Sequence, residues 1–121
     1  MTDYAAMTDR EIDALVAERV MGWTGIHVEE IPKCGVKLLV GLDPERNIVD
    51  AIWNYSTNAN SALEVAKEFE RRHPNENVLL NTDGGDGWHA HASVFLRNGD
   101  AWNASPARAI CEAILQATEP E

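Results

Sequence analysis

The sequence has 121 residues, which suffice for one domain of ordinary size but not for two. Hydrophobic residues make up 45% and charged residues 25%, a balance that is typical of soluble globular proteins and argues against a disordered chain. With 20 acidic and 10 basic side chains, the formal net charge is −10, which excludes general nucleic-acid binding and disfavours contact with anionic membranes. We expect a single domain over residues 1–121, with short flexible ends at about 1–6 and 118–121.

Neither a membrane span nor a secretory signal is expected from the sequence. The apolar runs are all shorter than the roughly 20 residues that a spanning helix requires. Residues 1–4 contain no basic region and no apolar core. Cys34 and Cys111 lie far apart and outside any C-x-x-C motif, which favours two reduced thiols over a disulfide framework. We therefore expect a cytosolic protein in which both cysteines are buried.

The first helix has the strongest local signals. Thr8 has the residue type of an N-cap, and Glu11 three residues later completes a capping box. Gly22 is suited to end the helix. Between these points apolar residues recur at helical spacing, at Ile12, Leu15, Val16 and Val20. These signals predict a helix at about 9–21.

Two strands are expected next. Residues 23–35 contain glycine and proline without a clear period, so we interpret them as irregular, with a short strand near 26–28. Residues 37–42 form a near-continuous apolar run, which is typical of a strand that is buried on both faces. A turn at 43–47 and a second strand at 48–53 complete a predicted hairpin.

A second helix follows this hairpin. Ser56, Thr57 and Asn58 each suit an N-cap, and Pro74 marks the end of the helix. Apolar residues between these points again recur at helical spacing, at Ala62, Val65, Ala66 and Phe69. The segment after Asn58 is therefore predicted to be an amphipathic helix.

Two further strands flank a glycine-rich loop. Residues 78–80 are predicted as the third strand and residues 88–96 as the fourth, with an alternation that puts His89 and His91 on one face. Residues 83–87 between the strands contain three glycines, which are costly inside a regular element. The two aspartates of this segment lack the spacing of a calcium loop, so we expect a plain hairpin loop.

The third helix completes the predicted order. Residues 98–100 predict the end of the fourth strand, and the helix begins with Ser105 as N-cap and Pro106 at its first position. The element order is thus α-β-β-α-β-β-α. Two hairpins among three helices predict a mixed α/β (α+β) fold, a three-layer α-β-α sandwich with a mostly antiparallel four-stranded sheet that helices cover on both faces.

Three segments together carry a family resemblance: residues 15–23 of the first helix, residues 55–58 at the start of the second, and residues 104–111 of the third. In this order they resemble the phage ABA sandwich domain family, small proteins of phages and prophages that are named for an α-β-α sandwich. Asn58 stands where the family pattern usually has aspartate. The resemblance spans nearly the whole chain and implies both the sandwich fold and a setting in the cytoplasm of an infected bacterium.

His89 and His91 form an H-x-H motif on one face of the fourth strand. Two such histidines chelate a metal if a third ligand joins them, and His27, Asp83 and Asp86 are candidates for that ligand. A polar strand face that contacts an organic ligand is the alternative explanation. We expect this second alternative, with no metal and no other cofactor.

Two helix starts are candidate anion sites. Backbone N–H groups at the start of the second helix, with the hydroxyls of Ser56 and Thr57, suit an anion, and Tyr55 beside them can stack on a ring. Ordinary capping is the alternative. Arg108 lies in the first turn of the third helix, where a cation opposes the helix dipole. It either pairs with a carboxylate or holds an anionic ligand.

Four tryptophans are many for a chain of this length. Trp53 and Trp88 fall on predicted strands, where we expect burial in the core. Trp23 and Trp102 fall in predicted loops, where an indole is either buried or free to stack on a nucleobase. We include Trp23 and Trp102 among the candidate ligand-binding residues.

The sequence contains no nucleophile elbow, P-loop or H-E-x-x-H motif, so we predict no catalytic residue and no enzymatic activity. The favoured function is that of a phage-derived protein that sequesters a nucleotide immune signal, such as a cyclic dinucleotide, and so counters host antiphage defence. The candidate ligand-binding residues are Trp23, Tyr55, Ser56, Thr57, Asn58, His89, His91, Trp102 and Arg108.

An acidic protein-interaction module is the alternative function. The net charge of −10 suits a basic host or phage protein as partner, and it slows the capture of an anionic nucleotide. A nucleotide sponge, in contrast, commonly places its sites between subunits, so the favoured function implies a homo-oligomer in the host bacterial cytoplasm.

Overall fold

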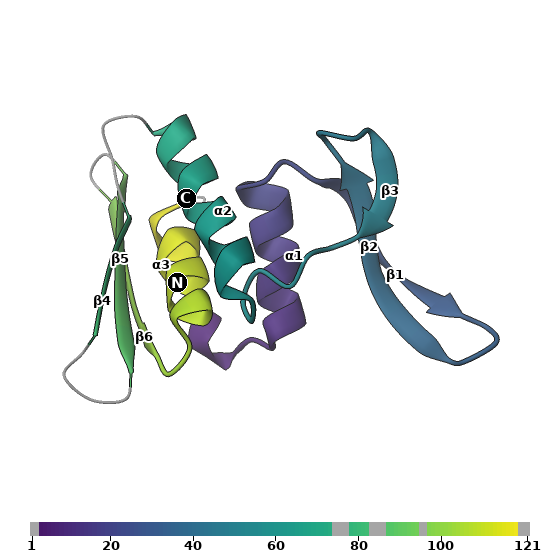
Figure 1. Ribbon diagram of the computed structural model, residues 1–121, viewed down its shortest axis with the longest axis horizontal. Helices are drawn as coiled ribbons and strands as arrows, with labels where there is room; N and C mark the ends of the chain where they lie inside the picture. The colour runs from purple at the N-terminus through teal and green to yellow at the C-terminus, as the bar shows by residue number, and fades with distance from the viewer. Residues whose placement is uncertain (1–2, 74–77, 83–86, 95–96, 119–121) are drawn as a thin grey trace.

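The computed structural model describes residues 3–73, 78–82, 87–94 and 97–118. Two three-stranded antiparallel sheets lie on opposite sides of the molecule, with the helices between them (Figure 1). We name strands β1, β2 and β3 the arm sheet, and strands β4, β5 and β6 the core sheet. The elements in chain order are η1 (Tyr4–Ala6), α1 (Asp9–Arg19), β1 (Thr24–Ile31), β2 (Val36–Asp43), β3 (Ile48–Ala51), α2 (Ala59–Arg72), β4 (Val78–Thr82), β5 (Trp88–Val94), β6 (Arg97–Asn103) and α3 (Pro106–Ala117).

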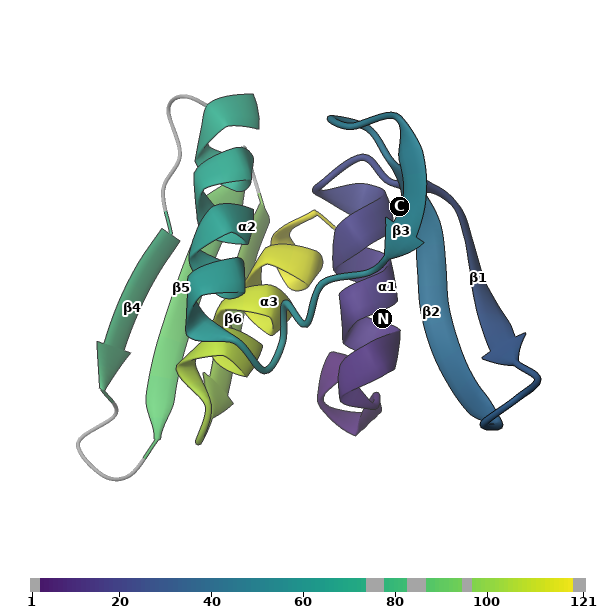
Figure 2. The ribbon, with the colours of Figure 1, turned by 45° about the vertical axis from the view of Figure 1, so that its right-hand side comes forward.

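Helix α3 is the centre of the packing. Every residue from Ala107 to Leu115 is buried, and the helix packs against β5, β6, α2 and α1. Figure 2 shows it between the core sheet and α1. The predicted start is confirmed, because Ser105 accepts a hydrogen bond from the N–H of Arg108 and Pro106 occupies the first helical position. The alanines of this helix let neighbouring elements approach it from several sides.

The core sheet packs closely on α3 because β5 and β6 present small residues to this helix. Ala90, Ala92 and Ala101 are buried there. At Gly99 a side chain has no room, because an added Cβ would lie 1.8 Å from the carbonyl oxygen of Ala113. Glycine at this position therefore allows the closest approach of sheet and helix.

The arm sheet covers α1 with one face only. Ile26 and Leu39 pack against the hydrophobic core, whereas Leu38, in the run predicted to be buried on both faces, is 38% exposed. That prediction is wrong because, in the described part of the chain, the helices lie on one side of this sheet (Figure 1). Large apolar side chains exposed on the arm sheet are Val28, Ile31, Val36, Leu38, Ile48 and Val49.

The sheets differ from the predicted single sheet of four strands. Strand β1 extends over Thr24–Ile31 rather than 26–28, and Arg97–Asn103 forms β6, although residues 98–100 predict the end of a strand. Asparagine, glycine and aspartate are rare in strands, so the local pattern conceals β6. Its pairing with β5 overrides that preference. The layers are therefore sheet, helices and sheet, and the predicted coverage of one sheet by helices on both faces is wrong.

The helix ends lie close to their predicted positions. Helix α1 begins at Asp9 with a complete capping box between Thr8 and Glu11, and it ends at Arg19, two residues before the predicted end. Asn58 is the N-cap of α2. Within the described ranges, the length and hydropathy of every helix fall short of what a membrane span needs.

The two cysteines have different environments. Cys111 is buried as predicted, whereas Cys34 is exposed in the turn between β1 and β2, so the prediction of burial is wrong there. Burial raises the pKa of the Cys111 thiol above its ordinary value. Cys111 is therefore a neutral core residue, and its Sγ donates to the carbonyl oxygen of Tyr55 at 3.4 Å.

Candidate functional site

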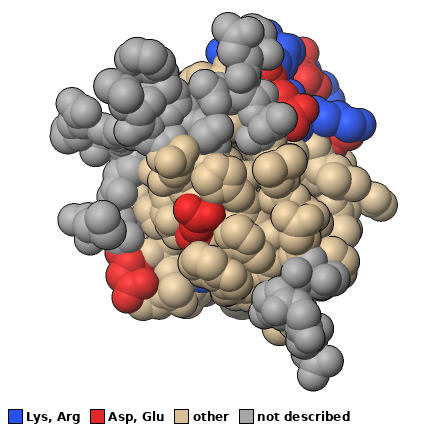
Figure 3. All heavy atoms as spheres, turned by 90° about the vertical axis from the view of Figure 1, so that its left-hand side faces the viewer, with Lys and Arg blue, Asp and Glu red and all other residues tan. Residues whose placement is uncertain are grey.

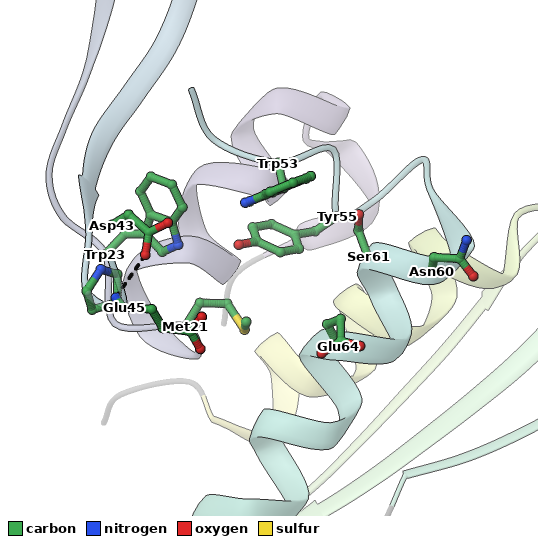
Figure 4. Close-up of a pocket in the computed structure, with 10 residues that line it drawn as sticks. Met21, Trp23, Asp43, Glu45, Trp53, Tyr55, Asn60, Ser61 and Glu64 are labelled. Atoms are coloured by element: carbon green, nitrogen blue, oxygen red, sulfur yellow. Dashed lines mark hydrogen bonds between the residues drawn. The ribbon is translucent and has the colours of Figure 1, made fainter. Parts of the chain in front are cut away.

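A pocket lies at the junction between the arm sheet and the helices (Figure 4). Its volume is about 370 Å³, within the range of small-molecule binding sites. The walls come from the α1–β1 connection, the β2–β3 turn, the segment between β3 and α2, and the first turns of α2. The lining residues are Met21, Trp23, Asp43, Pro44, Glu45, Trp53, Tyr55, Asn60, Ser61 and Glu64.

Helix α1 holds the segment between β3 and α2 in place. The buried carboxylate of Asp13 accepts a hydrogen bond of 2.8 Å from the backbone N–H of Ser56. Arg10 donates to the other oxygen of Asp13 at 2.8 Å and to the carbonyl oxygen of Ile52 at 3.3 Å. These bonds fix the ends of the short segment that carries two of the aromatic side chains in the pocket.

Three aromatic side chains form the apolar wall. Trp23 and Tyr55 are each 3% exposed, whereas Trp53 is 56% exposed. Figure 4 shows Trp53 and Tyr55 projecting from the segment before α2 into the same space. Burial raises the pKa of Tyr55 to about 12, against the opposite effect of a hydrogen bond from Trp23. Tyr55 therefore contributes a neutral hydroxyl to the pocket.

Carboxylates form the polar wall. Asp43 accepts hydrogen bonds from Nε of Arg46 and from the backbone N–H of Glu45, both at 2.9 Å. Burial acts to raise the pKa of Asp43, but these bonds outweigh it and hold the pKa below its ordinary value. Glu45 and Glu64 are exposed, and Glu64 accepts a hydrogen bond from Lys67 at 3.4 Å. This wall is anionic at neutral pH.

The combination of aromatic rings and carboxylates selects what the pocket accepts. Among the described residues that line it there is no lysine and no arginine. Aromatic faces bind planar rings and cations. Carboxylate oxygens accept hydrogen bonds from ribose hydroxyls or base N–H groups. A phosphate in the pocket would meet carboxylates without a basic partner, so the pocket favours the base and ribose of a nucleotide over its phosphate.

The start of α2, a predicted anion site, is occupied by capping and packing contacts. Asn58 accepts a hydrogen bond from the N–H of Ser61 at 3.1 Å. Ser56 is buried, and its hydroxyl donates to the carbonyl oxygen of Asp9 at 3.1 Å. Thr57 is exposed beside them. These contacts correspond to the capping alternative, although Ser61 itself lines the pocket.

The histidine motif lies on a different part of the molecule, the outer face of the core sheet. His89 Nε2 and His91 Nδ1 lie 3.0 and 2.8 Å from the same carboxylate oxygen of Asp100. Trp102, on β6, is 62% exposed and stacks on His89, with 4.6 Å between the ring centroids. Figure 3 shows this side of the molecule, where most of the described residues at the centre of the view are uncharged. His89, His91 and Trp102 do not line the pocket.

The residues considered for a metal site do not come together. His27 lies on β1 of the arm sheet and pairs with Glu29 at 3.0 Å, whereas the H-x-H motif belongs to the core sheet. Asp83 and Asp86 lie outside the described residues. Within residues 3–73, 78–82, 87–94 and 97–118, no group of three or more His, Cys, Asp or Glu side chains is arranged to hold a metal ion.

The side chain of Arg108 makes its hydrogen bonds to other residues of the protein. Its guanidinium donates to the carboxylates of Asp9 at 2.7 Å and Glu112 at 3.0 Å. It also donates to the carbonyl oxygens of Tyr4 at 2.9 Å and Met7 at 2.6 Å. Arg108 is buried and does not line the pocket. These contacts match the ion-pair alternative and give Arg108 the role of joining α3 to the N-terminal segment.

The sequence pattern misses several residues of the pocket. Trp53 is predicted to lie in the core because it ends a strand pattern, but β3 ends at Ala51 and the indole is exposed. The available signal is the W-x-Y spacing of Trp53 and Tyr55 directly before a helix cap. Glu45 and Glu64 carry no local signal, because carboxylates are common throughout this acidic chain.

Comparisons with known proteins found a similarity to a protein family and to solved structures. The model of the phage ABA sandwich domain matches residues 14–115. The chain is also similar to a phage protein from Bacillus cereus ATCC 14579, whose crystal structure was solved at 2.0 Å. The TM-score is 0.67 and the sequence identity 19%, over 100% of this chain and 94% of that chain, a likeness that shows the fold. The comparison with curated proteins found no match.

Proposed function

The chain belongs to the phage ABA sandwich domain family, and we propose that this phage protein binds a nucleotide immune signal of the host, such as a cyclic dinucleotide, and sequesters it. The observation that carries the proposal is the pocket of about 370 Å³ with an aromatic wall and a wall of hydrogen-bond acceptors. Its volume and mixed lining are typical of sites for small organic molecules.

The pocket fits the base and ribose of such a ligand. The exposed indole of Trp53 offers a face for stacking, and stacking of a base on an aromatic side chain contributes about 1–3 kcal/mol. Glu45 and Glu64 offer acceptors for ribose hydroxyls. The phosphates then point to solvent, where the net charge of −10 repels them least. Sequestration needs affinity and no catalytic group, and we place it in the host bacterial cytoplasm.

A homo-oligomer is part of this proposal, and the outer face of the arm sheet supports it. Val36, Leu38 and Val49 are exposed there and uncharged. Two copies of a chain with a net charge of −10 repel each other, so a second copy approaches at low electrostatic cost on a face whose exposed side chains are mainly apolar. Its one carboxylate beside Leu38, that of Glu29, is paired with His27. We therefore propose that this face contacts a second copy of the chain.

Thermal melting with a panel of cyclic and linear nucleotides tests the function. A nucleotide that binds the folded protein stabilises it by mass action, by about 2.7 kcal/mol at a hundredfold excess over Kd, and so raises the melting temperature. Trp53→Ala should abolish most of that rise. Trp102→Ala is the matched control, because its indole is exposed to a similar extent but lies on the outer face of the core sheet. A loss confined to Trp102→Ala would move the site to the core sheet.

The acidic protein-interaction module remains the second candidate function. The exposed carboxylates Glu45 and Glu64 beside the exposed indole of Trp53 also suit a lysine or arginine of a basic partner protein. If no nucleotide of the panel raises the melting temperature, the result contradicts sequestration. Retention of one basic protein from infected-cell lysate, lost on Trp53→Ala and kept on Trp102→Ala, would then support this second function.

A further inference from the structure

The charge of the pocket distinguishes it from an ordinary phosphate-binding site. Sites for phosphates supply lysine, arginine or backbone N–H groups. Here three carboxylates, those of Asp43, Glu45 and Glu64, line the pocket, and no basic side chain of the described residues does. The backbone N–H of Ser61 is occupied by the Asn58 cap. The part of a ligand that enters therefore gains from being positively charged.

The carboxylates differ in how far their charge is already compensated. Asp43 is paired with Arg46, which also pairs with Asp50. Glu64 has a single long contact with the exposed Lys67. Glu45 takes part in no salt bridge among the described residues. Glu45 and Glu64 thus supply the charge that acts on a ligand.

The aromatic wall favours the same kind of group. The faces of Trp and Tyr rings attract cations through their quadrupole, and cages of such rings are the usual sites for quaternary ammonium groups. Trp23 and Tyr55 are buried, while Trp53 is exposed and can lie over an entering group. The thioether of Met21 adds a soft, polarisable surface. Rings and carboxylates together surround a cation on several sides.

We infer that the pocket selects ligands whose ring or headgroup carries a fixed positive charge, such as a nucleotide with an N-alkylated base, and leaves the phosphates of that nucleotide outside. The nucleotide part of this inference rests on the proposed function. The charge preference rests on the aromatic rings and the carboxylates of Glu45 and Glu64, which act on any organic cation of suitable size.

Two isosteric ligand pairs test the inference by calorimetric titration of the full chain. Choline and 3,3-dimethylbutan-1-ol have nearly the same shape but differ in charge. Oxidised and reduced nicotinamide mononucleotide share ribose and phosphate but differ in the charge of the ring. The charged member of each pair should bind about tenfold more tightly.

Charge-neutral variants identify the side chains responsible. Glu45→Gln and Glu64→Gln should each reduce the preference for the charged member about threefold, because each removes one of the two least compensated charges in the pocket. Glu30→Gln is the matched control, since Glu30 is exposed on β1 and does not line the pocket. It should leave the preference unchanged.

The outcomes separate the inference from the proposed function. Equal affinity within both pairs, or tighter binding of the neutral members, overturns the charge preference, even if nucleotides bind. Preference for choline without any nucleotide binding supports the charge preference and overturns the proposed function. Absence of binding by all four probes overturns the charge preference, and a nucleotide panel that leaves the melting temperature unchanged overturns the proposed function as well.

Discussion

The two sheets of this protein have the same topology but very different packing. Each consists of three antiparallel strands paired in chain order. The core sheet presents small residues to the buried helix α3, and Gly99 lets the two backbones approach closely. The arm sheet packs one face against α1 and leaves branched apolar side chains such as Val36 and Val49 exposed. Small residues therefore accompany close packing here, and large apolar residues do not by themselves indicate burial.

This difference also explains where the pocket lies. Its walls come from both regions, because the β2–β3 turn of the arm sheet faces the first turns of α2. The well-packed half provides a rigid support, and the arm sheet provides side chains that are free to contact a ligand or a second copy. We expect changes in the first region to alter stability and changes in the second to alter binding or assembly.

The largest expected effect is that of Arg108→Ala in the well-packed half. The substitution leaves the carboxylate of Glu112, whose side chain is 4% exposed, without its ion-pair partner. Removing one partner of a buried pair typically costs about 3–5 kcal/mol. Urea unfolding should show this loss, with nucleotide affinity unchanged in the protein that remains folded. Unchanged stability together with lost nucleotide binding would return Arg108 to the list of ligand contacts.

Gly99→Ala compares the two sheets directly. The added Cβ meets the backbone of Ala113 at 1.8 Å, so sheet and helix must move apart, at an expected cost of about 3 kcal/mol. The partner variant is Gly25→Ala in the arm sheet, where no atom lies within 4 Å but φ is +62°. Gly25→Ala should therefore cost only the strain of a positive φ, about 1 kcal/mol in the free energy of unfolding. Equal losses in urea unfolding would contradict the difference in packing.

Thr8→Ala tests the helix between the two regions. It removes the side-chain acceptor for the N–H of Glu11 and breaks the capping box of α1. The expected loss in the free energy of unfolding is about 1 kcal/mol, the usual size for an N-cap. Because α1 supports the arm sheet, hydrogen exchange should quicken in β1 more than in β5. Equal quickening in both strands would show that α1 stabilises the whole molecule evenly.

Asp43→Asn gives a pH-dependent effect confined to the arm sheet and the pocket. The folded-state pKa of Asp43 lies below its ordinary value of 3.8. The stability that its ionised carboxylate contributes is therefore fully present above pH 3.8 and is lost as the pH falls through the folded-state pKa. At pH 7 the variant should be less stable by about 1 kcal/mol, because the partner Arg46 is half exposed. The difference should shrink below about pH 4. A difference that persists undiminished at pH 2 would exclude the Asp43–Arg46 pair as its cause.

Val49→Lys should have the smallest effect on folding. Its side chain is exposed on the outer face of the arm sheet, so the free energy of unfolding of the monomer should change by less than about 0.5 kcal/mol. If a second copy covers this face, sedimentation should show dissociation of the variant at concentrations where the original chain is associated. If the unsubstituted chain sediments as a monomer, the proposal that this face contacts a second copy is wrong.

Much of the local structure follows from short stretches of sequence. The capping box of Thr8 and Glu11 and the Ser105–Pro106 start of α3 are confirmed in the structure. These signals are reliable because donor and acceptor lie within three or four residues of each other. The mixed α and β composition and the family were predicted for a similar reason, since both depend on elements in chain order.

The pocket was only half predictable. Trp23 and Tyr55 line it as candidate ligand-binding residues, but Glu45 and Glu64 join it from the β2–β3 turn and from α2. No spacing rule connects these positions, because the pocket forms only when the arm sheet packs beside α2.

The sequence by itself determined where α1 and α3 begin and placed the end of α1 within two residues, since the capping residues act on neighbouring backbone groups. Tertiary structure alone decided that six strands form two sheets, that Arg108 has internal partners up to 104 residues away, and that Trp53 is exposed. Pairing, burial and ion pairing depend on which distant segments meet. That choice is made by the packing of the whole chain, in which local preferences such as those at residues 98–100 are outweighed by partners on another strand.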